Sequence, residues 1–256
     1  MLPRSPETRL GGFLRILVLL LGCTGAFAQD HEREARWAEE TLATLVEGEP
    51  LRLTQTNGHR FLALWLPAKE ARGAVIIAHG RGWSPDYDLY GVLRVKLAEA
   101  GYSTLSLQMP VLPGTAKIGD YIPTYGDADE RIALAVDWLK AKGNSKVAIV
   151  SHSLGATMAN HYLIHRADPK VQAWVFIGII NGLEDMFRIK IPVLDVYGSE
   201  DWSVTIVGAD ERRKQIMAIP GSQQVAVAGA MHFFDHPRDE LTRIIVRFLD
   251  PVPKRP

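Results

Sequence analysis

The stretch VAIVSHSLGA, residues 147–156, passes from an unbroken apolar run into a cluster of small residues around a serine. The apolar run predicts a buried strand, and LGATMANHYLIHR at 154–166 predicts a helix directly after it. Ser153 therefore stands in the turn between a strand and a helix. Ser151 and Gly155 are the small neighbours that a turn sharp enough to expose a nucleophile requires, although serine and glycine also occur in ordinary turns.

The same alternation of strands and helices continues along most of the chain. Further strands are predicted at 51–54, 61–66, 73–80, 103–111, 173–180, 192–198 and 223–229. Helices are predicted at 31–46, 88–100, 127–143, 210–219 and 238–249. Apolar strands joined by helices indicate an α/β fold with a mostly parallel sheet of about eight strands and helices on both faces.

Composition excludes several classes of partner. The 256 residues include 29 basic and 29 acidic side chains, and no basic run stands out. We therefore expect no nucleic-acid partner and no attraction to an anionic surface. The sequence shows no spacing typical of a metal site and no glycine-rich dinucleotide motif, so we expect neither a metal nor another cofactor.

The first 28 residues have the three parts of a secretory signal peptide. Arginines precede the short apolar run ILVLLLG, and Ala26-Phe27-Ala28 forms a small-x-small cleavage site. Cleavage there would begin the mature chain at Gln29 and export it to the periplasm or the medium. The competing interpretation is a lipoprotein signal ending at Cys23, whose acylation would anchor the protein to a membrane. We divide the remainder into an N-terminal helix and linker at 29–50, the main domain at 51–250 and a tail at 251–256.

Two residues later in the chain could activate Ser153. Asp201 follows the strand predicted at 192–198, and His232 follows the strand predicted at 223–229. The carboxyl ends of parallel strands share one edge of a sheet, so a serine, an acid and a histidine would meet there in that order. The competing acids are Glu184, Asp185, Asp195 and Glu200, and the competing histidine is His236.

With SHSLG, GSEDWSV and GAMHFF in these places, the chain resembles the α/β-hydrolase superfamily over residues 50–250. The resemblance implies the α/β-hydrolase fold and a catalytic triad of Ser153, Asp201 and His232. In HGRGW at 79–83, it implies an oxyanion hole made by the backbone N–H groups of Arg81 and Leu154. The first glycine of the usual Gly-x-Ser-x-Gly motif is a serine here. The closest likeness is to a little-characterised branch of exported bacterial envelope hydrolases, which names no substrate.

The expected activity is hydrolysis of a carboxylic ester, a thioester or an amide through an acyl-enzyme. The alternatives are an acyltransferase with the same nucleophile and a non-catalytic binding protein of the cell envelope. Only ten residues, 181–190, lie between Ile180 at the end of one predicted strand and Ile191 at the start of the next, where many such hydrolases carry a lid, so we expect an open site for short acyl groups. Candidate substrate contacts are Trp83, Tyr121 and Tyr125, the tyrosines lying in a predicted irregular loop at 111–126.

Overall fold

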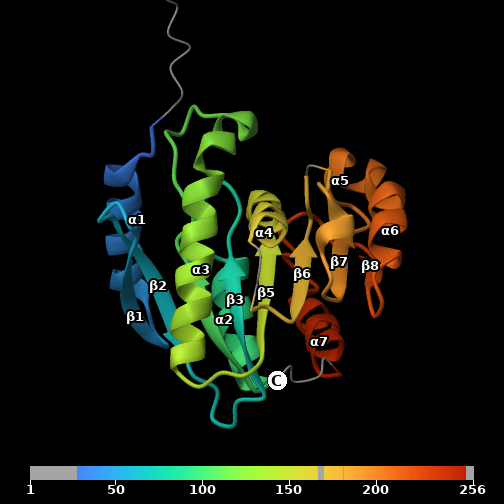
Figure 1. Ribbon diagram of the computed structural model, residues 1–256, viewed down its shortest axis with the longest axis horizontal. Coiled ribbons are helices and arrows are strands. Elements are labelled where there is room, and N and C mark those ends of the chain that lie inside the picture. Colours follow the sequence, from blue (N-terminus) through green and yellow to red (C-terminus); the bar gives the residue numbers. More distant parts are fainter. Residues whose placement is uncertain (1–27, 167–169, 181, 252–256) are drawn as a thin grey trace, which may run out of the picture.

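The computed structural model describes residues 28–166, 170–180 and 182–251. One eight-stranded sheet runs through it, in the order β1-β2-β4-β3-β5-β6-β7-β8 (Figure 1). Its strands are β1 Glu49–Thr54, β2 Arg60–Leu66, β3 Gly73–Ala78, β4 Tyr102–Leu107, β5 Val147–His152, β6 Ala173–Ile177, β7 Val193–Gly198 and β8 Gln223–Val227. The pairs β1·β2 and β2·β4 are antiparallel and all other pairs are parallel. The predicted mostly parallel sheet of about eight strands is confirmed.

Helices cover both faces of this sheet (Figure 1). They are α1 His31–Thr44, α2 Leu89–Glu99, α3 Tyr125–Ala141, α4 Leu154–His165, α5 Ser203–Val207, α6 Ala209–Met217 and α7 Arg238–Leu249. The helices α3 and α4 pack on one face, which includes Ile76 and Ile149, whereas α2 and α7 pack on the other, which includes Val75 and Val150. Alternate residues of the central strands β3, β5 and β6 thus enter two different cores, which is why these strands are apolar over most of their length.

The N-terminal helix α1 adds a smaller core at the antiparallel edge. Asp30 caps it by accepting a hydrogen bond from the backbone N–H of Arg33 at 2.9 Å. Ala38 then packs against Leu62 and Leu64 of β2. This packing fixes α1 beside the hairpin of β1 and β2, far along the strand order from β7 and β8.

Two segments differ from the sequence-based expectation. The loop expected to be irregular at 111–126 contains a 3-10 helix, η1 Ile118–Thr124, and leads directly into α3. The short helix α5 is a second difference, because no amphipathic repeat in SVTIV predicts it. In the segment between β6 and β7, the described residues form only the three-residue turn η2 Met186–Arg188, so no lid is evident there.

Most of the predicted signal peptide, with Cys23, lies outside the described residues, as does most of the predicted tail at 251–256. Among the described residues, no helix is both long and apolar enough to cross a bilayer.

Candidate active site

The turn that carries Ser153 is strained in the manner of a nucleophile elbow. Ser153 has φ 55° and ψ −121°, between the last residue of β5 and the first residue of α4. A residue with a Cβ rarely adopts a positive φ, so the surrounding packing must hold it there. Gly155 makes that packing possible, because a Cβ at this position would lie 2.4 Å from the carbonyl oxygen of His79. The elbow therefore depends on α4 approaching the backbone at the end of β3.

Ser153, His232 and Asp201 form a continuous chain of hydrogen bonds at the carboxyl edge of the sheet. The His232 Nε2 atom lies 3.1 Å from Ser153 Oγ, and His232 Nδ1 lies 2.7 Å from Asp201 Oδ1. All three residues are buried. Because the carboxylate accepts the Nδ1 proton, Nε2 is left to accept the proton of the serine hydroxyl. The structure thus brings together the three residues selected from the sequence.

The remaining candidate acids and the second histidine lie elsewhere. Glu184 and Asp185 are exposed, and Asp185 pairs with Arg188 at 3.8 Å. Asp195 is buried inside β7, where its Oδ2 accepts hydrogen bonds from Arg212 and Gln224, each at 2.8 Å. Burial raises the pKa of Asp195, against the opposing effect of the Arg212 charge. Glu200 and His236 are exposed.

Burial and hydrogen bonding act in opposite directions on Asp201. Loss of solvent favours the neutral carboxyl, but the hydrogen bond and charge of His232 and the N–H groups of Trp202 and Gly198 favour the carboxylate. The net effect is a pKa below the ordinary value for Asp201. The acid is therefore charged at neutral pH, as a group that orients an imidazole must be.

Two glycines allow the loops after β6, β7 and β8 to converge. Gly178 has φ 54°, and a Cβ there would lie 3.1 Å from both Asp201 Oδ2 and His232 Nδ1. Gly198 ends β7, and a Cβ there would lie 2.0 Å from the carbonyl oxygen of Ala230. Larger side chains at either position would push the acid and the histidine apart.

A second histidine, His152, supports the backbone on which His232 stands. Its Nε2 lies 3.0 Å from the His232 carbonyl oxygen, and its Nδ1 lies 2.8 Å from the Tyr90 hydroxyl. The Tyr90 oxygen in turn accepts the Gly80 N–H at 2.9 Å. These bonds assign the neutral tautomer with a proton on Nε2. Burial, followed by the nearby His232 ring, lowers the pKa of His152 to about 3.

His79 holds the loop after β3 in a similar way. Its Nδ1 lies 2.8 Å from the Gly80 carbonyl oxygen, while its Nε2 accepts the Met109 N–H at 2.9 Å. Burial lowers the pKa of His79 to about 4. Both His79 and His152 are thus uncharged at neutral pH, and both hold the backbone around the site.

Arg81 and Leu154, the predicted oxyanion-hole residues, directly follow Gly80 and Ser153 in the chain. Leu154 is the first residue of α4, where N–H groups have no intrahelical acceptor. Arg81 follows Gly80, at which an added Cβ would lie 3.1 Å from Ser153 Cβ. The Arg81 guanidinium points elsewhere and donates to the carbonyl oxygen of Ala116 at 2.8 Å. Within the described residues, neither backbone N–H has a hydrogen-bond acceptor.

Comparison with solved structures identifies the architecture. Est1E from Butyrivibrio proteoclasticus superposes with a TM-score of 0.63 at 17% identity, over 79% of this chain and 97% of that one. An α/β serine hydrolase homologue from Coxiella burnetii gives 0.63 at 18% identity, over 80% and 99%. XC6422 from Xanthomonas campestris, described as a serine hydrolase without lid, gives 0.63 at 17% identity, over 83% and 98%. The chain has the α/β-hydrolase fold.

Sequence comparison adds little to this result. A family model described as a protein of unknown function (DUF3530) matches residues 23–128, which is less than half of the chain and ends before Ser153. No curated protein matches the chain. At these identities, the likeness to solved structures establishes the α/β-hydrolase fold alone.

Aromatic rings surround the histidine at this edge of the α/β-hydrolase fold. The indole of Trp202 stacks on the His232 imidazole, with centroids 3.6 Å apart and planes 13° apart. Phe233 meets His232 edge to face at 5.1 Å, and Trp83 meets Phe233 at 5.2 Å. Neither Trp202 nor Phe233 was predicted from the sequence, although each directly follows a residue of the predicted triad. Trp202 remains 48% exposed, so its ring forms part of the open surface beside the histidine.

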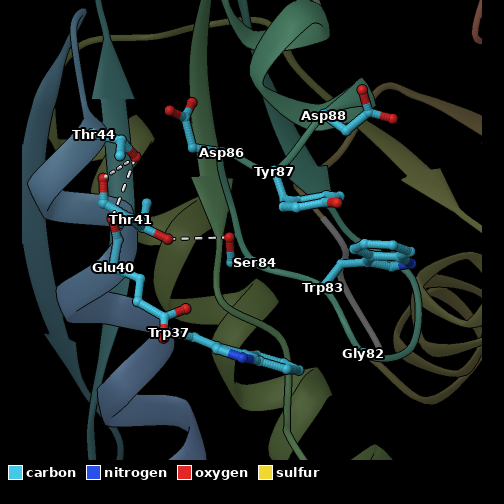
Figure 2. Close-up of a pocket in the computed structure, with 10 residues that line it drawn as sticks. All are labelled: Trp37, Glu40, Thr41, Thr44, Gly82, Trp83, Ser84, Asp86, Tyr87 and Asp88. Atoms are coloured by element: carbon cyan, nitrogen blue, oxygen red, sulfur yellow. Dashed lines mark hydrogen bonds between the residues drawn. The ribbon is translucent and has the colours of Figure 1, made fainter.

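A groove lies next to these aromatic rings (Figure 2). It has a volume of about 370 Å³ and lies between α1 and the loop at 82–88. Trp83 lines it and stacks on Tyr87 at 4.4 Å, and Trp37 of α1 lines it from the other side. Trp83 therefore belongs both to the groove and to the group of aromatic rings around His232.

Tyr121 and Tyr125 lie in the core on the α3 side of the sheet. The Tyr121 hydroxyl accepts the Leu112 N–H at 3.4 Å, and Tyr125 packs edge to face on His161 at 5.4 Å. No hydrogen bond or ring contact joins either tyrosine to Ser153, Asp201 or His232 in the described part of the chain. The two candidate substrate contacts are thus buried in the core, Tyr121 within η1 and Tyr125 as the first residue of α3.

Proposed function

We propose that the protein is a serine hydrolase that cleaves a carboxylic ester, or a related thioester or amide, through an acyl-enzyme. The observation that carries the proposal is the hydrogen-bond chain from Ser153 through His232 to Asp201, with its serine on a strained elbow. The α/β-hydrolase fold supports it only as background, since one fold can serve many functions.

In the proposed mechanism, His232 accepts the proton of Ser153 through Nε2 while the serine oxygen attacks the substrate carbonyl. Asp201 holds the imidazole in the required tautomer and stabilises the imidazolium that forms. The N–H groups of Arg81 and Leu154 stabilise the tetrahedral oxyanion. His232 then protonates the leaving group, and water attacks the acyl-enzyme by the same route in reverse.

We assign Trp202 a supporting part in this mechanism. Its ring is nearly parallel to the imidazole, so the electron-rich face of the indole lies against the ring that becomes positively charged. The contact favours the imidazolium and also limits rotation of His232. Asp201 and Trp202 would thus act on the same ring from its edge and from its face.

Because no lid is evident among the described residues between β6 and β7, we expect small or short-chain acyl substrates, with Trp83 as an aromatic contact. Hydrolysis of p-nitrophenyl esters should fall as the acyl chain lengthens, with no sharp rise across the substrate's critical micelle concentration. A preference for long chains together with such a rise would indicate a lipase instead.

A fluorophosphonate probe tests the nucleophile directly. The purified protein should be labelled at Ser153, and Ser153→Ala should lose both labelling and several orders of magnitude in ester hydrolysis. Ser203→Ala is the matched control, because Ser203 is an exposed serine near the site at the start of α5. Hydrolysis that survives in Ser153→Ala would sink the mechanism, and labelling without hydrolysis would favour an acyltransferase.

We also propose export, with Gln29 as the first residue of the mature chain. In the structure, the Gln29 amide donates to Asp127 Oδ2 at 2.8 Å and its oxygen accepts from Arg131 at 3.2 Å. Cyclisation of an N-terminal glutamine would remove the donor to Asp127, so we expect Gln29 to stay uncyclised. Mass spectrometry of the mature protein should show Gln29 as its first residue. A lipid-modified Cys23 would show instead that the protein is anchored to a membrane.

A further inference from the structure

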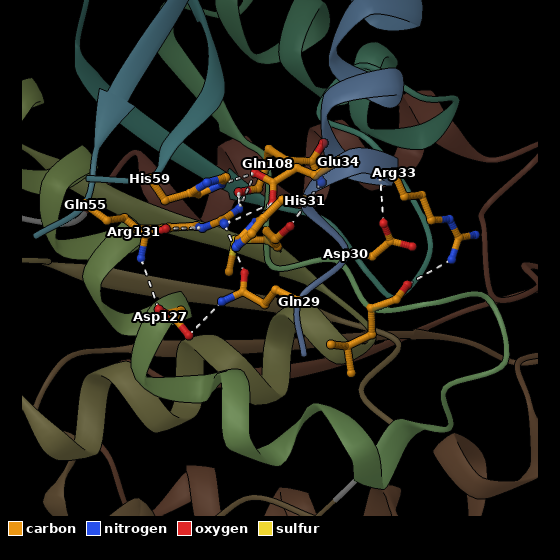
Figure 3. A network of polar contacts seen from close by, with 12 residues as sticks. Gln29, Asp30, His31, Arg33, Glu34, Gln55, His59, Gln108, Asp127 and Arg131 are labelled. Carbon is orange, nitrogen blue, oxygen red and sulfur yellow. Dashed lines mark hydrogen bonds and ion pairs between the residues drawn. The ribbon is translucent and has the colours of Figure 1, made fainter. Parts of the chain in front are cut away.

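Two histidines and a glutamate that are not part of the triad meet at α1 (Figure 3). His31 and Glu34 lie one turn apart on α1, and His59 comes from the turn between β1 and β2. His59 Nε2 lies 3.1 Å from Glu34 Oε1, and His31 Nδ1 lies 3.8 Å from Glu34 Oε2. One donor atom from each residue lies within 4.8 Å of the other two.

These separations are close to those of a metal site. An ion bound at about 2.0–2.2 Å to imidazole nitrogen and carboxylate oxygen requires its ligand atoms to lie about 3–4 Å apart. His31 has half of its side chain exposed, so its ring can make the small movement that remains. The exposed side of the cluster also leaves room for water as a further ligand.

Arg131 fixes the carboxylate from behind. Its guanidinium donates to Glu34 Oε1 at 3.0 Å and to Oε2 at 3.1 Å, and both side chains are buried. Each carboxylate oxygen has two acceptor positions, so this fork leaves one position on each oxygen for the histidine side. Hydrogen bonds that orient a ligating carboxylate are a usual feature of metal sites.

The surrounding charge suits a cation. Gln55 donates to Asp127 and Glu130, and it accepts from Arg131, so three carboxylates and one guanidinium belong to the same network. With neutral histidines, the side chains of this network carry two negative charges in excess, counted as Glu34, Asp127 and Glu130 against Arg131. The α-ammonium group of a mature chain that begins at Gln29 would reduce this excess to one, so the network still attracts a cation.

The simpler interpretation is a hydrogen bond from His59 to Glu34 with His31 as a bystander. It does not explain why the two imidazoles stack 4.0 Å apart with one nitrogen of each near the same carboxylate. We propose that His31, Glu34 and His59 bind one divalent transition-metal ion of the zinc type. Two imidazoles and one carboxylate form a ligand set that such ions prefer over magnesium or calcium.

The ion would join α1 to the hairpin of β1 and β2. A site formed by the folded chain stabilises that chain when the ion binds. Since β1 and β2 lie at the opposite end of the sheet from β7 and β8, we assign the ion a structural role and no part in ester hydrolysis.

Titration of the untagged, metal-free protein with zinc chloride tests the proposal. We expect one equivalent to bind, and the melting temperature to rise by about 5–10 °C at a hundredfold excess over Kd. His31→Ala and His59→Ala should each weaken binding at least tenfold, and the double variant should abolish the melting shift. Cobalt(II) should give the visible absorption of a low-symmetry nitrogen and oxygen site in the wild type only.

The matched control is the double variant His161→Ala/His165→Ala. These rings also stack at 4.0 Å, and His161 also lies 3.0 Å from a carboxylate, that of Asp129. His165 Nδ1, however, lies 2.9 Å from the His161 carbonyl oxygen, so this pair lacks the three-donor arrangement. Zinc binding should be unchanged in it. Undiminished binding by the His31/His59 double variant, or no binding by the wild type at micromolar zinc, would overturn the proposal.

Discussion

Two regions of the protein are built from buried polar side chains. The triad edge is the carboxyl edge of the sheet with Ser153, Asp201 and His232, and the N-terminal network consists of Glu34, Arg131 and Gln55. Their residues come together in different ways. At the triad edge, Ser153, Asp201 and His232 each stand just beyond a strand of one parallel sheet. In the N-terminal network, Arg131 lies in the first half of α3 and meets Glu34 of α1, 97 residues earlier, and Gln55 from the end of β1. The carboxyl edge of the sheet brings the first set together, whereas the packing of α1 and α3 against the ends of β1 and β4 brings the second together.

The two regions should therefore fail in different ways. A change at the triad edge removes chemistry from a scaffold that remains intact, because the neighbouring strands do not depend on the hydroxyl or the imidazole. A change in the N-terminal network leaves a charge buried without its partner and weakens folding. The variants below test this separation.

Asp201→Asn should give the largest effect, a loss of about 10⁴-fold in kcat, since an asparagine favours the wrong histidine tautomer. Circular dichroism and the melting temperature should change little, because asparagine occupies the same space. Glu184→Gln and Asp185→Asn are the controls and should retain full activity, since both side chains are exposed. If one of these controls is inactive while Asp201→Asn is active, the acid belongs to the segment after β6.

Arg131→Met should lower the free energy of unfolding by about 3–5 kcal/mol, because Glu34 would remain buried without its guanidinium. At a temperature where the variant is folded, kcat should be close to that of the wild type. Urea denaturation and ester hydrolysis measure the two quantities on the same preparation. Lys170→Met, which breaks an exposed pair with Asp137, should change stability by less than about 1 kcal/mol. A large fall in kcat for folded Arg131→Met would show that the two regions are coupled.

The contrast also explains what the sequence could predict. Ser153, Asp201 and His232 could be predicted from the sequence because each follows an apolar run that by itself indicates a strand. The burial of Arg131 could not be predicted, because the residues around it in its amphipathic helix form the same pattern as those around a solvent-exposed arginine. His31 and Glu34 have helical spacing that a search could have noticed, but His59 joins them only through the pairing of β1 with β2. Tyr121 and Tyr125 were selected as substrate contacts because nothing in VLPGTAKIGDYIPTYG indicates that this segment forms a 3-10 helix and the start of α3 with both rings buried.

Acidic pH should lower the free energy of unfolding through two buried histidines at the triad edge, His79 and His152. Burial holds the pKa of His79 at about 4 and that of His152 at about 3, whereas both would titrate near 6.5 in the unfolded chain. Below pH 6.5 the unfolded chain binds more protons, so stability is full above that pH and declines as the pH falls toward the folded values. The decline is about 1.4 kcal/mol per pH unit for each histidine.

Urea midpoints at pH 7, 6 and 5 measure this dependence. His152→Gln can keep an amide donor toward the His232 carbonyl without a titrating ring, so its slope should be smaller by the contribution of one histidine. His236→Ala removes an exposed histidine and should leave the slope unchanged. A wild-type midpoint that stays constant between pH 6.5 and 5 would show that these rings are protonated in the folded protein.

Trp202→Ala should give the smallest effect and sharpen the account of the triad edge. A cation–π contact at a half-exposed site contributes about 0.5–1 kcal/mol, which corresponds to about a two- to fivefold loss in kcat when the indole is removed. Trp202→Phe keeps an aromatic face against His232 and should recover most of that loss. Because the contact strengthens only when the imidazole becomes charged, KM for a short ester should change less than kcat. If alanine and phenylalanine lower kcat equally, or if KM alone rises, Trp202 acts as a substrate contact and the stack contributes nothing to proton transfer.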